Sequence, residues 1–231
     1  MTFATVLRPV MALKSGKTRG SFLDRVLFEG EEEKPAEPGM ARLSPYDIEQ
    51  IDVSLLKAGL TDVVQLHGEE RSPLLFVAVA YATLASPRGR REVLTQLAEA
   101  QQRLNARVIL ELTHLDPGLP PSRLVELLGL VRPTCKTVFA RIRPERQAII
   151  AVTDCALGGV SLESSDLKTP EDEDYLTRVR LVMRSVGPRM MLHNLRTTAA
   201  INVAHAAGIT YASLDLTHTG AAEEATAGAA A

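Results

Sequence analysis

Acidic, histidine and arginine residues follow several apolar, strand-length runs of the chain, where they could hold a metal ion or exchange protons. Carboxylates and imidazoles hold divalent metals and act as general acids and bases, while guanidinium groups bind phosphate. A metal or acid–base site would draw on the acidic and histidine candidates. The ligand-binding candidates are Glu111, His114, Arg141, Glu163, His193 and Asp215.

The spacing of these candidates does not by itself specify a site. The chain has no pair of histidines one helical turn apart and no other fixed ligand spacing. Polar residues near strand ends also serve as hydrogen-bonded structural groups. The two cysteines, Cys135 and Cys155, fit no zinc motif and are too few for a disulfide framework, so we expect two buried thiols in a reducing compartment.

The candidates are positioned by apolar runs that alternate with amphipathic, helix-length segments. Most of the runs are continuously apolar, which is typical of parallel strands covered on both faces. A turn at Ser15-Gly16 joins the first two runs, so we expect them to pair antiparallel as a hairpin. The expected strands are 3–13, 21–28, 74–81, 107–113, 136–142, 159–164, 190–195 and 211–216.

Helices are expected in the intervals between these strands. Ser44-Pro45 supplies an N-cap and a proline at the first helical position, and Gly208 ends the last helix. The expected helices are 45–66, 88–104, 121–131, 145–155, 171–186 and 197–207.

Eight strands with helices between them predict a closed (β/α)8 barrel, whose function sits at the C-terminal ends of the strands. An open, doubly wound sheet is the alternative, although no G-x-G-x-x-G follows the first strand. We expect one barrel domain over residues 1–219. Within it, the acidic stretch at 29–43 is expected to be a flexible loop, and the Ala-rich tail at 220–231 is expected to be disordered.

The composition of the chain disfavours nucleic-acid and membrane partners. Lys and Arg number 26 and Asp and Glu number 28, so the net charge is 26 − 28 = −2, which argues against DNA binding. Aromatic residues make up 4% of the chain and Trp is absent, which disfavours a stacking platform for single strands. No apolar run approaches the roughly 20 residues that cross a bilayer. We therefore expect a cytoplasmic protein without a membrane or DNA partner.

Four stretches resemble the EAL domain, the bacterial phosphodiesterase fold that acts on cyclic di-GMP. FATVLRPVMALKSGK resembles the start of the family, and VAVAYATLASP resembles its V-N-x-S strand. VILELTH resembles the E-x-T-E strand, and HNLRT resembles E-G-V-E-T. The resemblance covers roughly residues 3–217 and implies an EAL-type barrel whose first two strands form a hairpin.

The same resemblance implies that the catalytic motifs are lost. The family holds two divalent metals with acidic groups and one Asn, while a Lys and a Glu assist the attacking water. Glu111 matches the first Glu of E-x-T-E, and the other matched positions depart from the pattern. SFLDR at 21–25 lacks the E-A-L triplet, and the departing positions are Ala78, His114, Arg141-Ile142, Ser161, His193 and Ser213.

Three hypotheses follow. The first is a degenerate EAL-like domain without catalytic residues, metal or cofactor, which acts as a regulatory or protein-interaction module in bacterial signalling. The second is a metal-independent receptor for cyclic di-GMP or another nucleotide, with Arg141, Arg143 and Arg196 pairing with phosphates. The third is an enzyme with a re-purposed site at the barrel mouth. The expected partner is an unidentified protein. A homodimer of this chain is an alternative form of association.

Overall fold

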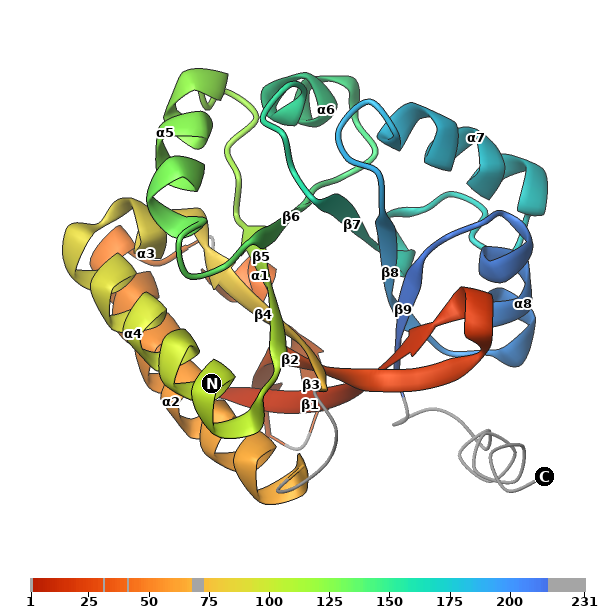
Figure 1. Ribbon diagram of the computed structural model, residues 1–231. Helices are drawn as coiled ribbons and strands as arrows, with labels where there is room; N and C mark the ends of the chain where they lie inside the picture. The colour runs from red at the N-terminus through yellow and green to blue at the C-terminus, as the bar shows by residue number, and fades with distance from the viewer. Residues whose placement is uncertain (1, 31, 41, 68–72, 216–231) are drawn as a thin grey trace.

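The computed structural model describes residues 2–30, 32–40, 42–67 and 73–215 and forms a closed α/β barrel (Figure 1). Around the barrel the strand order is β1-β9-β8-β7-β6-β5-β4-β2, and pairing of β2 with β1 closes the ring. The predicted eight-stranded barrel is confirmed, and the open sheet is excluded. The strands are β1 (Thr2–Ala12), β2 (Lys17–Glu29), β3 (Glu32–Pro35), β4 (Leu74–Ala80), β5 (Arg107–Thr113), β6 (Thr137–Arg141), β7 (Gly159–Glu163), β8 (Met190–Leu195) and β9 (Tyr211–Leu214).

The first two strands form the predicted antiparallel hairpin. β1 and β2 pair from Thr2↔Phe28 to Ala12↔Lys17. Gly16 lies between them at φ 62°, a left-handed conformation that glycine adopts without a steric cost. The pairs from β2–β4 through to β8–β9 are parallel, and β1 meets β9 antiparallel. A reversed first strand therefore closes an otherwise parallel ring.

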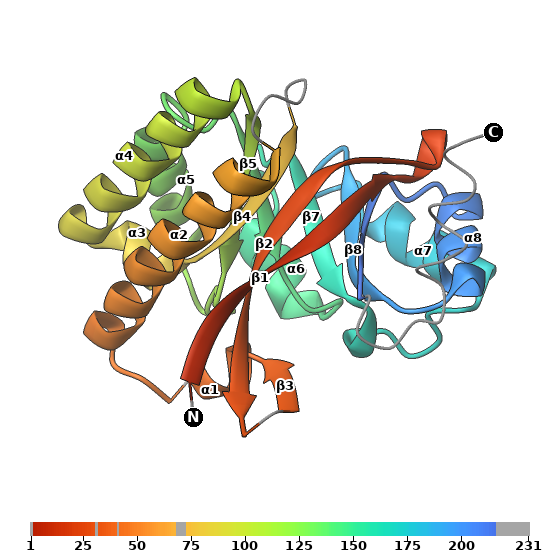
Figure 2. The same ribbon diagram turned by 90° about the horizontal axis from the view of Figure 1, so that it is seen from below.

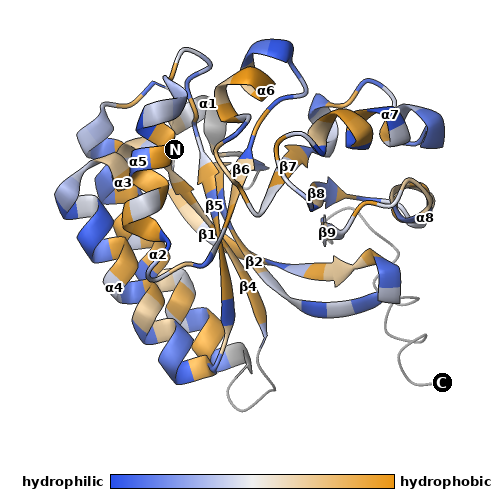
Figure 3. Cartoon of the chain, turned by 45° about the horizontal axis from the view of Figure 1, so that its top comes forward, coloured by the Kyte–Doolittle hydropathy of each residue, from blue (hydrophilic) through white to orange (hydrophobic). Residues whose placement is uncertain are grey.

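Helices cover the outside of the parallel strands (Figures 1 and 2). Their apolar faces turn toward the sheet and their polar faces turn outward, as the hydropathy colouring of α4 and α5 shows (Figure 3). The helices are α1 (Glu37–Met40), α2 (Pro45–His67), α3 (Tyr81–Ala85), α4 (Pro87–Leu104), α5 (Pro121–Val131), α6 (Arg146–Val152), α7 (Glu173–Met183) and α8 (Thr198–Ala206), with single 3₁₀ turns η1 (Leu13–Ser15) and η2 (Ser164–Asp166).

The strands separate two apolar layers. An outer layer packs the sheet against the helices with Leu, Val, Ile and Ala side chains. A smaller inner layer fills the barrel, where Phe22, Phe76, Phe139 and Met191 are completely buried. Successive side chains of a strand point to opposite faces, so each barrel strand serves both layers. The inner layer forms the floor beneath the polar residues of the mouth.

The acidic stretch at 29–43 departs from the prediction of a loop. Residues 32–35 form β3, which pairs antiparallel with β2 from Val26↔Pro35 to Glu29↔Glu32, and the short helix α1 follows. Two opposite charges, Lys34 and Glu29, lie 2.5 Å apart across this pair. Met40 of α1 is completely buried in a small apolar cluster. The loop prediction was wrong because residues 32–35 pair with β2, and Ala36 and Met40 anchor the residues that follow in this cluster.

Among the helices that the structure describes, none combines the length and the apolar character needed to cross a membrane. The predicted disordered tail at 220–231 and the end of the expected strand 211–216 lie outside the described residues.

Gly20 supports a close approach of β2 to β4, and its replacement tests this packing. A Cβ atom at Gly20 would lie 1.8 Å from the carbonyl oxygen of Leu74. We expect Gly20→Ala to lower the free energy of unfolding by about 1–3 kcal/mol, because overpacking would force the two strands apart. Urea denaturation measures the change.

Gly129→Ala is the matched control, since a Cβ atom there would meet nothing within 4 Å on α5. Alanine favours a helix interior over glycine by up to about 1 kcal/mol, so this variant should be neutral or more stable. Equal losses in the two variants would contradict the proposed close approach.

Candidate functional site

Direct contacts link four of the six predicted candidates at the mouth of the barrel. Glu111, Arg141, Glu163 and His193 lie on β5, β6, β7 and β8, which pair side by side in that order. Because these strands are parallel, their C-terminal ends meet at one edge of the barrel. The side chains are brought together by barrel topology, although they are distant in sequence.

Glu111 is the centre of this network and is completely buried. Its Oε2 accepts hydrogen bonds from Nη2 and Nε of Arg141 at 2.6 and 3.0 Å, and its Oε1 lies 2.7 Å from Nε2 of His193. Burial alone would raise the pKa of Glu111, but the charges of Arg141 and His193 hold this pKa well below its ordinary range. The carboxylate is therefore kept ionised inside the barrel.

Arg141 connects three carboxylates. Besides binding Glu111, its Nη1 lies 2.8 Å from Oε1 of Glu163, and its Nη2 lies 3.8 Å from Oδ1 of Asp24. Its guanidinium group stands 5.2 Å from the ring centre of Phe22, which is itself 4.5 Å from the His193 ring. The cation is thus held between an aromatic ring and surrounding carboxylates, where Coulomb attraction is strong because water is largely excluded.

A second arginine, Arg8 of β1, extends the network. Its Nε donates to Asp24 at 3.0 Å, its Nη1 lies 3.4 Å from Asp215, and its Nη2 contacts Glu33 of β3. Asp215 also accepts from Nε of Arg196 at 3.0 Å. The candidate Asp215 therefore joins the network through Arg8, at a distance from Glu111 along the ring.

Arg8 and Asp24 were missed as site residues. Both sit within strands that are otherwise mainly apolar, which was the available signal in the sequence. A charge in such a strand must find a partner when the strand is buried. The partner could not be named without knowing that β1 and β2 close the barrel.

A cavity of about 830 Å³ opens above the network, between the loops that follow β5 to β8. Three candidates line it, namely His114, Arg141 and Glu163, whereas Glu111, His193 and Asp215 are buried and do not. His114 and Asn194 line the cavity in left-handed conformations, at φ 54° and 60°. Asn and His are among the non-glycine residues that adopt this conformation most often.

The carboxylates do not fit the two divalent metals that the family resemblance implies. Two-metal sites need several anionic ligands around cations roughly 3.5–4 Å apart. Here Glu111, Glu163 and Asp24 all face the guanidinium group of Arg141. In the part of the chain that the structure describes, no group of three or more His, Cys, Asp or Glu side chains is arranged to hold a metal.

Removal of Arg141 tests how strongly the network depends on it. We expect Arg141→Met to lower the free energy of unfolding by about 3–5 kcal/mol, because Glu111 would be left buried without its main counter-charge. Arg143→Met is the control: the Arg143 side chain is 71% exposed, and its loss should change stability by no more than about 0.5 kcal/mol. Urea denaturation measures both.

The double variant Arg141→Met/Glu111→Gln should recover part of the loss, since it removes the unpaired charge. A cost for Arg141→Met no larger than that of the control would contradict the network.

The depressed pKa of Glu111 predicts a stability that depends on pH. A carboxyl whose pKa is lower in the folded state stabilises the fold fully above its unfolded value of about 4.3, and this contribution is lost as the pH falls further. Glu111→Gln should therefore show a shallower loss of stability than the parent below about pH 4.3. The exposed Glu126→Gln should follow the parent curve, and equal slopes for parent and Glu111→Gln would refute the prediction.

Comparisons with known proteins agree with this architecture. No protein-family model matches the sequence, and no curated protein matches it. Among solved structures, the YkuI protein of Bacillus subtilis, which has an EAL domain and was solved with the substrate c-di-GMP and calcium, matches with a TM-score of 0.70 at 14% identity. The match covers 97% of this chain and 60% of YkuI, so the chain spans well under the full length of that protein.

Two further structures match over most of both chains. The Xanthomonas citri FimX EAL domain in complex with c-diGMP has a TM-score of 0.65 and 14% identity, covering 94% of this chain and 87% of that one. An EAL domain protein from Listeria monocytogenes EGD-e has a TM-score of 0.65 and 10% identity, covering 91% and 85%. The fold of this chain is therefore the α/β barrel of EAL domains.

Proposed function

We propose that this chain is a non-catalytic module of EAL fold that acts in signalling by binding rather than by hydrolysis. The position of Arg141 carries the proposal. Its guanidinium group lies 2.6 Å from Glu111 and 2.8 Å from Glu163, so the positive charge among these carboxylates is already supplied by the protein. A divalent metal entering the cluster would meet the repulsion of Arg141 and compete for ligands that are already paired.

The matched catalytic positions support the same proposal. Ala78 stands where the resemblance expects an Asn, and Ser161 stands where it expects a Lys. Neither an alkyl group nor a neutral hydroxyl can replace a metal ligand or a cationic group that assists an attacking water. Hydrolysis by the family's mechanism would thus be without the Asn ligand and the assisting Lys.

Exposed apolar side chains support a protein-interaction role. Val125 and Leu130 of α5 are 46% and 54% exposed, and Ile150 of the neighbouring α6 is 57% exposed. Exposed apolar side chains on adjacent helices offer contact area to another protein. This surface lies outside the barrel and could serve a separate protein or a second copy of the chain.

The cavity supports a second candidate, a nucleotide receptor that needs no metal. Its volume of about 830 Å³ lies in the range of small-molecule sites. Arg143 on its wall is mostly exposed and lies 3.8 Å from Asp166, a loose pairing that a phosphate could replace. YkuI and the FimX EAL domain were each solved with c-di-GMP, which makes this dinucleotide the ligand to test first.

A re-purposed enzyme is less well supported. Its site would draw on Glu111, His114, His193 and Asp215, of which His114 alone lines the cavity. Glu111 and His193 are in contact but have no exposed surface. A general base must come within hydrogen-bond reach of the proton that it abstracts. Glu111 and His193 lie beneath the cavity floor and contact each other rather than a molecule in the cavity.

Incubation with cyclic di-GMP tests the main proposal. We expect no linear dinucleotide or mononucleotide product with added magnesium or manganese, measured by chromatography, because the carboxylates are engaged by Arg141. Turnover that depends on the added metal would overturn the non-catalytic assignment.

Calorimetry with cyclic di-GMP in a chelator separates the two binding roles. Saturable heat supports the receptor, and Arg143→Gln/Arg196→Gln should then weaken binding at least tenfold, while Arg103→Gln, at the far end of α4, should not. Absence of heat at high protein concentration would exclude the receptor and leave the protein-interaction role.

A further inference from the structure

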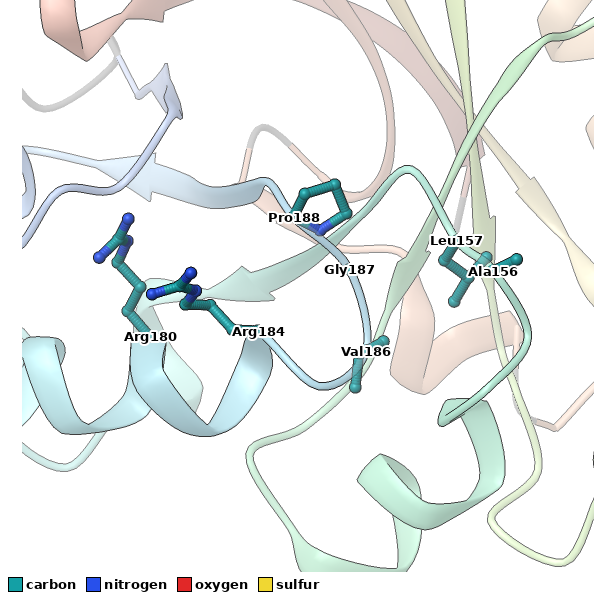
Figure 4. A pocket seen from close by; sticks show the side chains of 7 residues that line it. All are labelled: Ala156, Leu157, Arg180, Arg184, Val186, Gly187 and Pro188. Carbon is teal, nitrogen blue, oxygen red and sulfur yellow. The ribbon is translucent and has the colours of Figure 1, made fainter.

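A second cavity, of about 470 Å³, lies at the opposite end of the barrel from the mouth (Figure 4). It is an open depression, bordered by the last turn of α7, the segment before β7 and the turn that leads into β8. Because β7 and β8 begin here, this end carries the N-terminal ends of the parallel strands. The cavity is lined by Ala156, Leu157, Arg180, Arg184, Val186, Gly187 and Pro188.

Arg180 and Arg184 are the charged residues of this lining. They are one helical turn apart, and Figure 4 shows both side chains leaving α7 toward the same side. Among the described residues, neither guanidinium group has an ion-pair or hydrogen-bond partner. Two like charges at this spacing repel each other, so an anion between them would relieve the repulsion.

Burial and packing hold Arg180 in place. Arg180 is half-buried, and its Cζ lies 3.2 Å from the position that a Cβ atom would take on Gly208. Because Gly208 has no side chain, the guanidinium group of Arg180 fits against its backbone. The C-terminal end of α7 favours nearby cations through its dipole, which explains why two arginines are tolerated there but supplies no partner for their N–H groups.

The opposite wall of the cavity is also fixed. Asp154 and Ala156 adopt left-handed conformations at φ 63° and 53°. Nη2 of Arg132 donates to the carbonyl oxygens of Cys155 and Ala156, at 3.1 and 2.8 Å, and so holds this strained segment. Alanine gains no side-chain hydrogen bond from such a conformation, and the cost is of order 1–3 kcal/mol per residue. The wall is thus pre-formed rather than shaped by a ligand.

Further cations lie at the same end of the barrel. Arg107 is exposed at the start of β5, and Arg189 and Lys136 are exposed immediately before β8 and β6. Asp154 is an exposed acid of the neighbouring segment, but it does not line the cavity. A concave surface with charges of one sign raises the local concentration of oppositely charged ligands.

We propose that this cavity binds a small phosphate-bearing molecule between Arg180 and Arg184. Guanidinium groups match a phosphate with two parallel N–H···O bonds, and the volume suits a small ligand rather than a polymer. The site is separate from the mouth and does not depend on the function proposed there.

Titration of the whole chain with inorganic phosphate and pyrophosphate, followed by the guanidinium N–H signals in NMR, tests the proposal. We expect saturable shifts at Arg180 and Arg184. Affinity should fall at least tenfold in Arg180→Gln/Arg184→Gln and remain unchanged in Arg178→Gln, an exposed residue of α7 outside the lining.

Arg180→Lys/Arg184→Lys keeps both charges but removes the paired N–H geometry, so it should also bind more weakly than the parent. Equal binding by this variant would overturn guanidinium recognition. Shifts that sodium chloride reproduces at matched ionic strength, or an equal loss in Arg178→Gln, would overturn the site.

Discussion

The pairing of buried charge around Arg141 is the constraint on which the mouth of this barrel depends. Ionised carboxylates inside a protein are tolerated only when they are paired and hydrogen-bonded. Arg141 and Arg8 satisfy this requirement for a ring of acids that the strands bring together. Because the partners stand on different strands, their pairing also fixes how the strands close around the inner aromatic layer.

Arginine side chains have opposite surroundings at the two ends of the barrel. At the mouth, the guanidinium group of Arg141 is buried and surrounded by carboxylates, so it contributes to the architecture of the barrel. At the far end, Arg180 and Arg184 face a cavity without an acidic lining residue. The same side chain is structural in one setting and available for recognition in the other, and the difference lies in its neighbours.

Much of the fold could be predicted from the sequence because local patterns determine it. Continuous apolar runs placed β4 to β9, and the turn at Ser15-Gly16 placed the hairpin. β3 escaped prediction because its pairing with β2, rather than its own composition, makes it a strand. At the site, strand ends identified Glu111, Arg141, Glu163 and His193, but their partnerships depend on closure of the ring. Arg8 and Asp24 were missed for this reason.

The contact between Arg8 and Asp215 joins residues 207 positions apart. During synthesis the first strand emerges long before the residue that completes its charge balance. An N-terminal hairpin that folded early would expose Arg8 to water until β9 arrived, and closing so long a loop carries an entropic cost. Closure of the barrel therefore depends on both ends of the chain, because β1 pairs with β9 as well as with β2.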